Sequence, residues 1–114
     1  MAILPALSIQ EPWASMIASG EKTIEIRTWK TPHRGKVILC ASQKPAGPNA
    51  GQAFALAEIA DVRPLSESDA KKTGGVFIPD AFAWELKNVQ LFKKFPIKGK
   101  LGLFKIDTSL KKSI

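Results

Sequence analysis

Hydrophobic and polar residues alternate along several short segments of this chain, and this pattern predicts a β-rich fold. The clearest alternation covers residues 23–29, where isoleucines face one side and Glu25, Arg27 and Trp29 face the other. Further strands are predicted from apolar or alternating runs at residues 6–9, 36–41, 82–92 and 100–106. Segments this short indicate a small sheet of several strands.

One short helix is predicted after the first strand. Pro12 suits the first turn of a helix, and Trp13, Met16 and Ile17 at i, i+3 and i+4 form one apolar stripe. Gly20 follows as the expected C-terminal stop. The stripe predicts that this helix packs on the sheet.

The second half of the chain is less uniform in its pattern. Residues 66–69 resemble a capping box for another short helix, which two glycines at 74–75 end. Residues 52–62 have high helix propensity although their neighbours predict a sheet, so the pattern leaves their structure open. Pro96 is expected to break a strand, and residues 107–114 are expected to form a frayed tail.

The fold class that follows is a mixed, β-rich α+β domain that spans residues 1–114. We expect five to six strands in a curled sheet or barrel, together with two short helices. A chain of 114 residues that is 45% hydrophobic can form one core without metals or disulfides. No apolar run approaches the roughly 20 residues of a membrane helix, so we expect no membrane association.

Cysteine and histidine are too rare for several kinds of site. Cys40 is the only cysteine and His33 the only histidine. These counts argue against an internal disulfide, a Cys-rich zinc site and a Ser-His-Asp triad. We therefore expect no metal site and a reducing, cytoplasmic setting. We also expect no cofactor, and a monomeric protein.

Positive charge is concentrated in two blocks of the chain, whose formal net charge is +7. Residues 22–44 carry a net +5 and residues 87–114 a net +7, while the segments 1–21 and 45–86 are acidic. If the fold brings the two basic blocks onto one face, that face attracts phosphates. The alternative is a lysine-rich exterior that only keeps the protein soluble.

Lys22, Glu25 and Arg27 are the most informative polar residues. Glu25 and Arg27 share one face of the predicted strand, and Lys22 at its start can turn over the strand end. The two cations suit a phosphate or a base carbonyl, and the carboxylate can accept from an exocyclic amine. A neutralising surface trio of charges is the alternative interpretation.

Two motifs resemble a known family. The run LSIQEPWA at residues 7–14, followed by the pattern GxKxxExR at residues 20–27, is similar to the signature of the ASCH domain (activating signal cointegrator homology). This domain is a member of the PUA-like superfamily. The resemblance covers about residues 4–107, and it includes the runs RGKV at 34–37 and EIADVRPL at 58–65.

The resemblance implies a small PUA-like β-barrel with a cleft that binds RNA or nucleotides. It also makes residues 52–62 a strand. By analogy, Lys22, Glu25 and Arg27 line the cleft, with Ser42 or Lys44 near its rim.

A tryptophan could give the cleft a stacking face for a base. We expect Trp13 and Trp84 to pack in the core. Trp29 shares the parity of Glu25 and Arg27 and is therefore the better candidate for contact with a ligand.

Hydrolysis is the alternative function that the resemblance implies. Some bacterial relatives are amidohydrolases that act on acylated cytidine nucleosides with a Lys, a Thr and a Glu, and a related branch is linked to ribonuclease activity. Lys22 matches the family's lysine, but Glu25 stands where the threonine is expected, and Thr23 does not stand at that position. Glu67 is the nearest candidate for the distal glutamate. If the protein is an enzyme, Lys22 and Glu25 are the expected catalytic residues.

Overall fold

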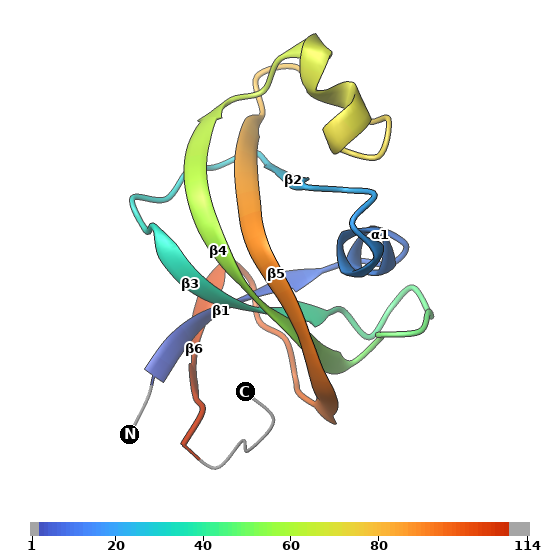
Figure 1. The fold of residues 1–114 in the computed structure, drawn as a ribbon, viewed down its shortest axis with the longest axis vertical. Helices are drawn as coiled ribbons and strands as arrows, with labels where there is room; N and C mark the ends of the chain where they lie inside the picture. Colours follow the sequence, from blue (N-terminus) through green and yellow to red (C-terminus); the bar gives the residue numbers. More distant parts are fainter. Residues whose placement is uncertain (1–2, 110–114) are drawn as a thin grey trace.

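A six-stranded mixed sheet is the framework of the computed structural model, which describes residues 3–109 (Figure 1). Two short helices accompany it, α1 (Trp13–Ser19) and the 3-10 helix η1 (Glu67–Lys72). The strands are β1 (Ile3–Ile9), β2 (Ile24–Arg27), β3 (Gly35–Ala41), β4 (Gln52–Pro64), β5 (Phe82–Pro96) and β6 (Leu103–Asp107).

The strands are ordered β2-β5-β4-β3-β1-β6 across the sheet. β1 and β3 are parallel, and the other neighbouring strands are antiparallel. The pairing of β4 with β5 shifts register at three places, and such irregularities bend and twist the strands. Both long strands are accordingly curved (Figure 1).

The predicted mixed, β-rich class is confirmed, but the predicted barrel is not. Within the described part of the chain, β2 and β6 are the two edges of the sheet and do not pair with each other. A barrel closed by hydrogen bonds would have no such edges. The sheet is curled and open.

Most of the predicted elements are found close to their expected places. The ambiguous residues 52–62 belong to strand β4, as the family resemblance implies. Pro96 does not interrupt a strand that ends at residue 92, because β5 continues to Pro96 opposite Gln52. Proline is tolerated at a strand end, where no ladder hydrogen bond needs its missing N–H. Of the expected frayed tail, residues 110–114 lie outside the described residues.

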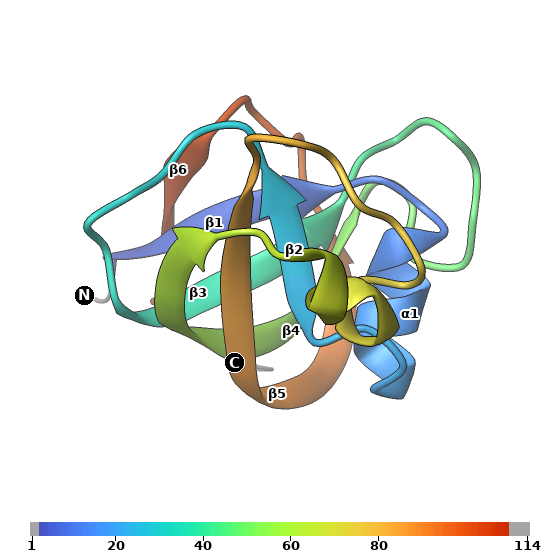
Figure 2. The same cartoon turned by 90° about the horizontal axis from the view of Figure 1, so that it is seen from above.

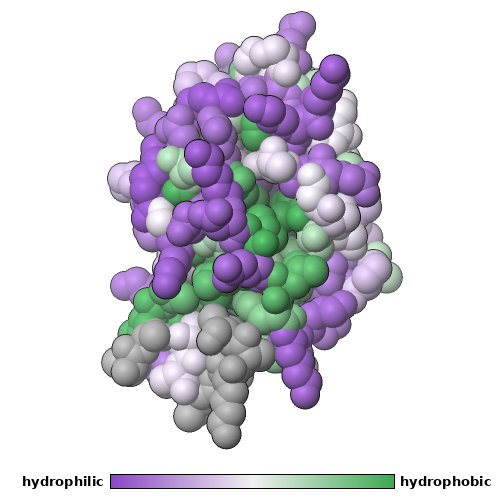
Figure 3. All heavy atoms as spheres, viewed as in Figure 1, coloured by the Kyte–Doolittle hydropathy of each residue, from purple (hydrophilic) through white to green (hydrophobic). Residues whose placement is uncertain are grey.

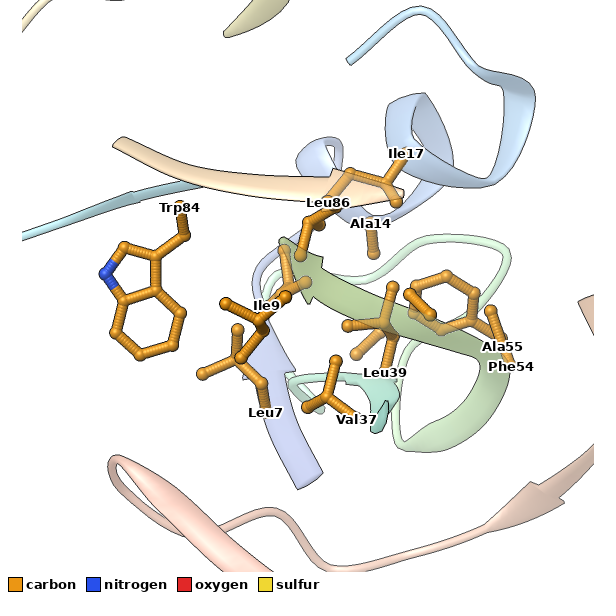
Figure 4. Packing of buried hydrophobic residues seen from close by; sticks show 13 residues of the cluster. Leu7, Ile9, Ala14, Ile17, Val37, Leu39, Phe54, Ala55, Trp84 and Leu86 are labelled. Carbon is orange, nitrogen blue, oxygen red and sulfur yellow. The ribbon is translucent and has the colours of Figure 1, made fainter. Parts of the chain in front are cut away.

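Two apolar clusters occupy the two faces of the sheet. The larger one packs α1 against the strands and contains Trp84, Phe54 and Leu39, all fully or nearly fully buried (Figure 4). The smaller one includes Ile38 and Cys40. Neighbouring residues of β3 thus point into different clusters, because side chains alternate across a strand.

The surface of the face seen in Figure 1 is not uniformly polar. Apolar side chains reach the surface in its middle and lower part, bordered by hydrophilic ones (Figure 3). Turned by 90°, the molecule shows the side on which α1, β2 and η1 lie (Figure 2). The candidate functional site lies on this side.

Candidate functional site

A cavity of about 670 Å³ opens between β2, α1, the segment that follows η1, and the connection from β5 to β6. This volume lies within the range of small-molecule pockets. Among the predicted site residues, Lys22, Glu25, Arg27 and Ser42 line the cavity. The structure therefore brings four of the six together.

The turn between α1 and β2 delivers Lys22 to the cavity. Gly20 has a positive φ of 88° and its N–H donates to the carbonyl of Ile17, which ends the helix. The backbone N–H of Lys22 then donates to the carbonyl of Met16 at 3.1 Å. The chain enters β2 directly afterwards.

The strand β2 supplies the other two charged residues. Its pairing with β5 sets Glu25 opposite Trp84 and Arg27 opposite Phe82. Glu25 and Arg27 lie two residues apart and therefore share one face, as the alternation predicted. The position of Lys22 before the strand frees it from this alternation.

The three side chains form a continuous chain of ion pairs. Lys22 Nζ lies 3.5 Å from Glu25 Oε1, and Arg27 Nη2 lies 2.8 Å from Glu25 Oε2. The side chains of Lys22 and Glu25 are only 3% and 8% exposed. Such pairing is what makes the burial of three charges tolerable.

The ammonium of Lys22 is held from several sides. It donates to the carbonyl of Thr73 at 3.0 Å, and it lies 5.5 Å from the ring centroid of Trp13. Burial lowers the pKa of Lys22, Glu25 opposes this effect, and Arg27 adds to it. Burial and Arg27 therefore destabilise the charged form of Lys22, and Glu25 stabilises it.

The guanidinium of Arg27 retains unused donor capacity. Nη2 donates to the carbonyl of Ser8 as well as to Glu25, both at 2.8 Å. Nε is buried, and no acceptor in residues 3–109 meets it. An unmet buried donor is uncommon in folded proteins and is costly unless a ligand or water satisfies it.

The entrance of the cavity is basic. Lys98 and Lys100, both exposed, line it from the connection between β5 and β6. Residues from both basic blocks of the sequence therefore meet at one cavity, as the interpretation of a shared basic face required. Glu25 is the only carboxylate among the described lining residues.

Two predicted site residues lie elsewhere. Trp29 does not line the cavity. Its ring packs edge-to-face against that of Trp84, with 4.7 Å between the ring centroids, and its backbone carbonyl accepts a hydrogen bond from Trp84 Nε1. The strand β2 ends at Arg27, so the parity that linked Trp29 to Arg27 does not extend to it. Lys44 is exposed in the loop between β3 and β4, outside the cavity lining.

Of the two tryptophans expected in the core, one is fully buried and the other also borders the cavity. Trp84 is fully buried, as expected. Trp13 packs against the larger cluster but also lines the cavity, so it is not a core residue alone. Trp13, rather than Trp29, is the tryptophan that a ligand in the cavity would meet.

Several lining residues were not predicted from the sequence. They come from β1 and its exit, from the segment after η1, and from the β5–β6 connection: Ser8, Gln10, Thr73, Val76, Ile97 and Leu101. Gly74 and the Lys-Gly-Lys run at 98–100 were the available signals, since Gly74 and Gly99 each mark a place where the backbone closely approaches another segment.

Only some of the residues considered for hydrolysis lie in the cavity. Thr23 does not line the cavity, and neither does the exposed Glu67. Thr73 does line it, but its hydroxyl is bonded to the backbone of Ala70 and Val76, and Lys22 contacts its carbonyl. No lysine–threonine hydroxyl pair is formed among these residues.

Residues 3–109 contain neither a metal-binding cluster nor a membrane-spanning helix. No cluster of three or more His, Cys, Asp or Glu side chains gathers there in a way that could hold a metal ion. None of the helices in this part of the chain has the length and apolar character needed to cross a membrane.

Similar solved structures share the fold. The crystal structure of ASCH from Zymomonas mobilis superposes with a TM-score of 0.68 at 14% identity, over 96% of this chain and 91% of that one. The crystal structure of a mutant of the Zymomonas mobilis protein gives a TM-score of 0.67 at 16% identity, over 90% of this chain and 89% of that one.

Sequence comparison identifies the family. Activating signal cointegrator 1 of Homo sapiens and of Mus musculus are 28% and 29% identical to this chain over 91% of its length. The chain spans only 22% of the length of these relatives. The family model of the ASCH domain matches residues 7–96, which include the end of β1, all of β2 to β5 and the ion-paired residues of the cavity. The chain therefore belongs to the ASCH domain family.

Proposed function

We propose that this protein binds RNA or a nucleotide in the cavity, and that it recognises a base or phosphate with Lys22, Glu25 and Arg27. The observation that carries the proposal is the chain of ion pairs on the floor of a cavity with an exposed basic entrance. Donors and an acceptor are held there at fixed positions, so little side-chain conformational freedom is lost on binding.

The floor offers both kinds of hydrogen-bonding group that a base edge needs. The ammonium of Lys22 and the half-buried guanidinium of Arg27 can donate to base carbonyls or ring nitrogens. Glu25 Oε1 accepts from the backbone N–H of Ile26 and pairs with Lys22, whereas Oε2 accepts only from Arg27 among the described residues and has a second lone pair for an exocyclic amine. A base is therefore a chemically complete match for this floor.

The walls suit the faces of a base. Trp13, Ile26 and Val76 are half-buried and line the cavity. Aromatic and aliphatic surfaces of this kind stabilise a base by stacking and by exclusion of water. Polar groups on the floor and apolar groups on the walls together favour an unpaired base over duplex nucleic acid.

The test is a titration with short single-stranded RNA. We expect Lys22→Ala and Arg27→Ala each to weaken binding by about tenfold or more, since one specific base contact contributes roughly 1–3 kcal/mol. Lys87→Ala is the matched control, because Lys87 is an exposed lysine of β5 outside the cavity. Circular dichroism confirms that each variant is folded.

Equal losses in all three variants would contradict the proposal, because only nonspecific attraction between the lysine-rich surface and phosphates would remain.

A small hydrolase that uses the same cavity is the second candidate. It is supported by the lowered pKa of the buried Lys22 beside Glu25, since perturbed groups of this kind occur at catalytic sites. The protein would be incubated with acylated cytidine nucleosides and with single-stranded RNA. Turnover that disappears in both Lys22→Ala and Glu25→Ala would replace the binding function by catalysis; no turnover at high protein concentration supports binding.

A further inference from the structure

The entrance of the cavity differs in chemistry from its floor. On the floor, Lys22 and Arg27 are both paired with Glu25. At the entrance, Lys98 and Lys100 are exposed, and neither is paired with a carboxylate in residues 3–109. Net positive charge is therefore located at the entrance.

The backbone between these two lysines lies directly on the wall of the cavity. A Cβ atom placed on Gly99 would lie 2.7 Å from Ser8 Oγ and 3.2 Å from Ser8 Cβ. Ser8 itself lines the cavity and shares a hydrogen bond of 3.1 Å with Ser42. A larger residue would force Ser8 or the backbone to shift, so Gly99 allows the backbone that carries Lys98 and Lys100 to lie close to the cavity wall.

We propose that Lys98 and Lys100 bind the phosphate of a nucleotide whose base occupies the cavity. This inference rests on the proposed function and adds that the base lies on the floor while the phosphate is bound at the rim, by residues other than Lys22, Glu25 and Arg27. A phosphate is strongly hydrated and is costly to bury, so it favours the solvent-exposed rim over the floor. The two ammonium groups there have no carboxylate partner within residues 3–109, so they can donate hydrogen bonds to a phosphate without first breaking an ion pair.

Two kinds of ligand can supply this phosphate: a free mononucleotide, or single-stranded RNA through one of its phosphodiesters. The exposed position of both lysines is compatible with either, because the chain of an RNA strand can leave the cavity through the entrance. The experiment therefore includes both ligands. Inorganic phosphate is a third probe, which separates charge attraction from recognition of the joined base and phosphate.

The experiment compares affinities for ribonucleosides, their 5′- and 3′-monophosphates, inorganic phosphate and a short single-stranded oligoribonucleotide. We expect the wild-type protein to prefer a monophosphate or the oligonucleotide over the nucleoside. In Lys98→Ala/Lys100→Ala this preference should fall by about tenfold. The control Lys87→Ala/Lys105→Ala removes the same charge from exposed positions outside the cavity and should retain the preference.

The two proposals fail in different ways. If both double variants reduce the preference equally, or if neither does, the rim lysines have no special role and this inference is wrong. The proposed function itself stands in that case, provided that Lys22→Ala and Arg27→Ala still lose affinity. If these two variants bind every ligand as the wild-type protein does, the proposed function is wrong.

Gly99→Ala is a second variant that leaves both lysines in the chain. The added methyl group must displace either the Ser8 side chain or the backbone that carries the two lysines, so the preference for the phosphorylated ligand should fall although the net charge is unchanged. A retained preference in Gly99→Ala together with a retained preference in the lysine double variant would overturn the inference.

Discussion

Glu25 is the residue on which the electrostatics of the cavity depend. Its carboxylate lies between the ammonium of Lys22 and the guanidinium of Arg27, and its side chain is only 8% exposed. The pKa of Lys22 is lowered mainly by burial, and Glu25 is the group that counteracts this. Removal of its charge leaves two cations close together in a poorly solvated place.

The substitution Glu25→Gln tests this dependence. We expect the free energy of unfolding at neutral pH to fall by about 3 kcal/mol, because a buried cation loses its partner. Urea denaturation measures the change. Glu67→Gln is the control, since Glu67 is exposed, and it should change stability by less than about 0.5 kcal/mol.

The deficit of Glu25→Gln should become smaller at alkaline pH. The pKa of Lys22 is lower in the folded protein than in the unfolded chain, so the unfolded chain binds more protons between these two values. Stability contributed by this group therefore rises with pH through that window. Loss of the Glu25 charge lowers the pKa of Lys22 further, so the variant regains more stability with rising pH than the wild-type protein does. A deficit that is independent of pH would show that the loss does not come from the charge of Lys22.

At the scale of elements, one cluster joins η1 to the sheet. Arg63 of β4 donates two hydrogen bonds to Asp69 of η1, at 2.8 and 2.9 Å, and one to Glu85 of β5, at 2.8 Å. Asp69 also accepts from the backbone N–H of Ser66 as part of a capping box. The cluster positions η1, whose exit supplies the carbonyl of Thr73 to Lys22.

The substitution Asp69→Asn tests the cluster through its pH dependence. The hydrogen bonds from Arg63, together with that from Ser66, lower the pKa of Asp69 to about 2. A carboxylate with a lowered pKa stabilises the fold above its unfolded value near pH 4, and this stability is lost as the pH falls toward about 2. We expect the wild-type protein to lose about 2 kcal/mol over this range and Asp69→Asn to lose less.

Chemical denaturation between about pH 2 and pH 7 measures this difference. Asp61→Asn is the control, because Asp61 is exposed: it pairs with Arg34 at 3.7 Å and accepts from the backbone N–H of the adjacent Val62, and exposed ion pairs contribute little. If Asp69→Asn and the wild-type protein lose stability in parallel, Asp69 is not the group that titrates.

The sequence predicted the features that depend only on neighbouring residues, such as the alternation in β2 and the end of α1. Alternation placed Glu25 and Arg27 on one face, and Gly20 marked the helix end, because both features depend on neighbouring residues alone. The same alternation misplaced Trp29, since the parity of a strand has no meaning beyond its last paired residue. The stripe on α1 predicted that Trp13 packs inward, but it could not show that the ring also borders a cavity.

At the scale of the whole molecule, the cavity depends on contacts between segments that are distant in sequence. Residues 22–27, 73–78 and 97–102 all contribute to its lining. No local pattern reveals such a meeting, because it is determined by the strand order and by the curvature of β4 and β5. The predicted barrel was not confirmed for the same reason, since closure depends on whether the two edge strands pair.

The meeting of these segments separates two kinds of positive charge. Lys22 is 3% exposed, and both Lys22 and Arg27 are paired with Glu25, so they are poorly placed to exchange counterions with the solvent. Lys98 and Lys100 are exposed and hold no carboxylate partner within residues 3–109. Affinity at the floor should therefore depend little on salt, and affinity at the rim should depend on it strongly.

The salt dependence of binding to single-stranded RNA tests this division. Each phosphate contact contributes about −0.7 to the slope of log affinity against log salt, so Lys98→Ala/Lys100→Ala should make the slope shallower by about 1.4. Lys22→Ala should lower the affinity and leave the slope nearly unchanged. Lys87→Ala/Lys105→Ala should alter neither, because both lysines lie outside the cavity. Equal changes of slope in the two double variants would show that RNA follows the lysine-rich surface as a whole.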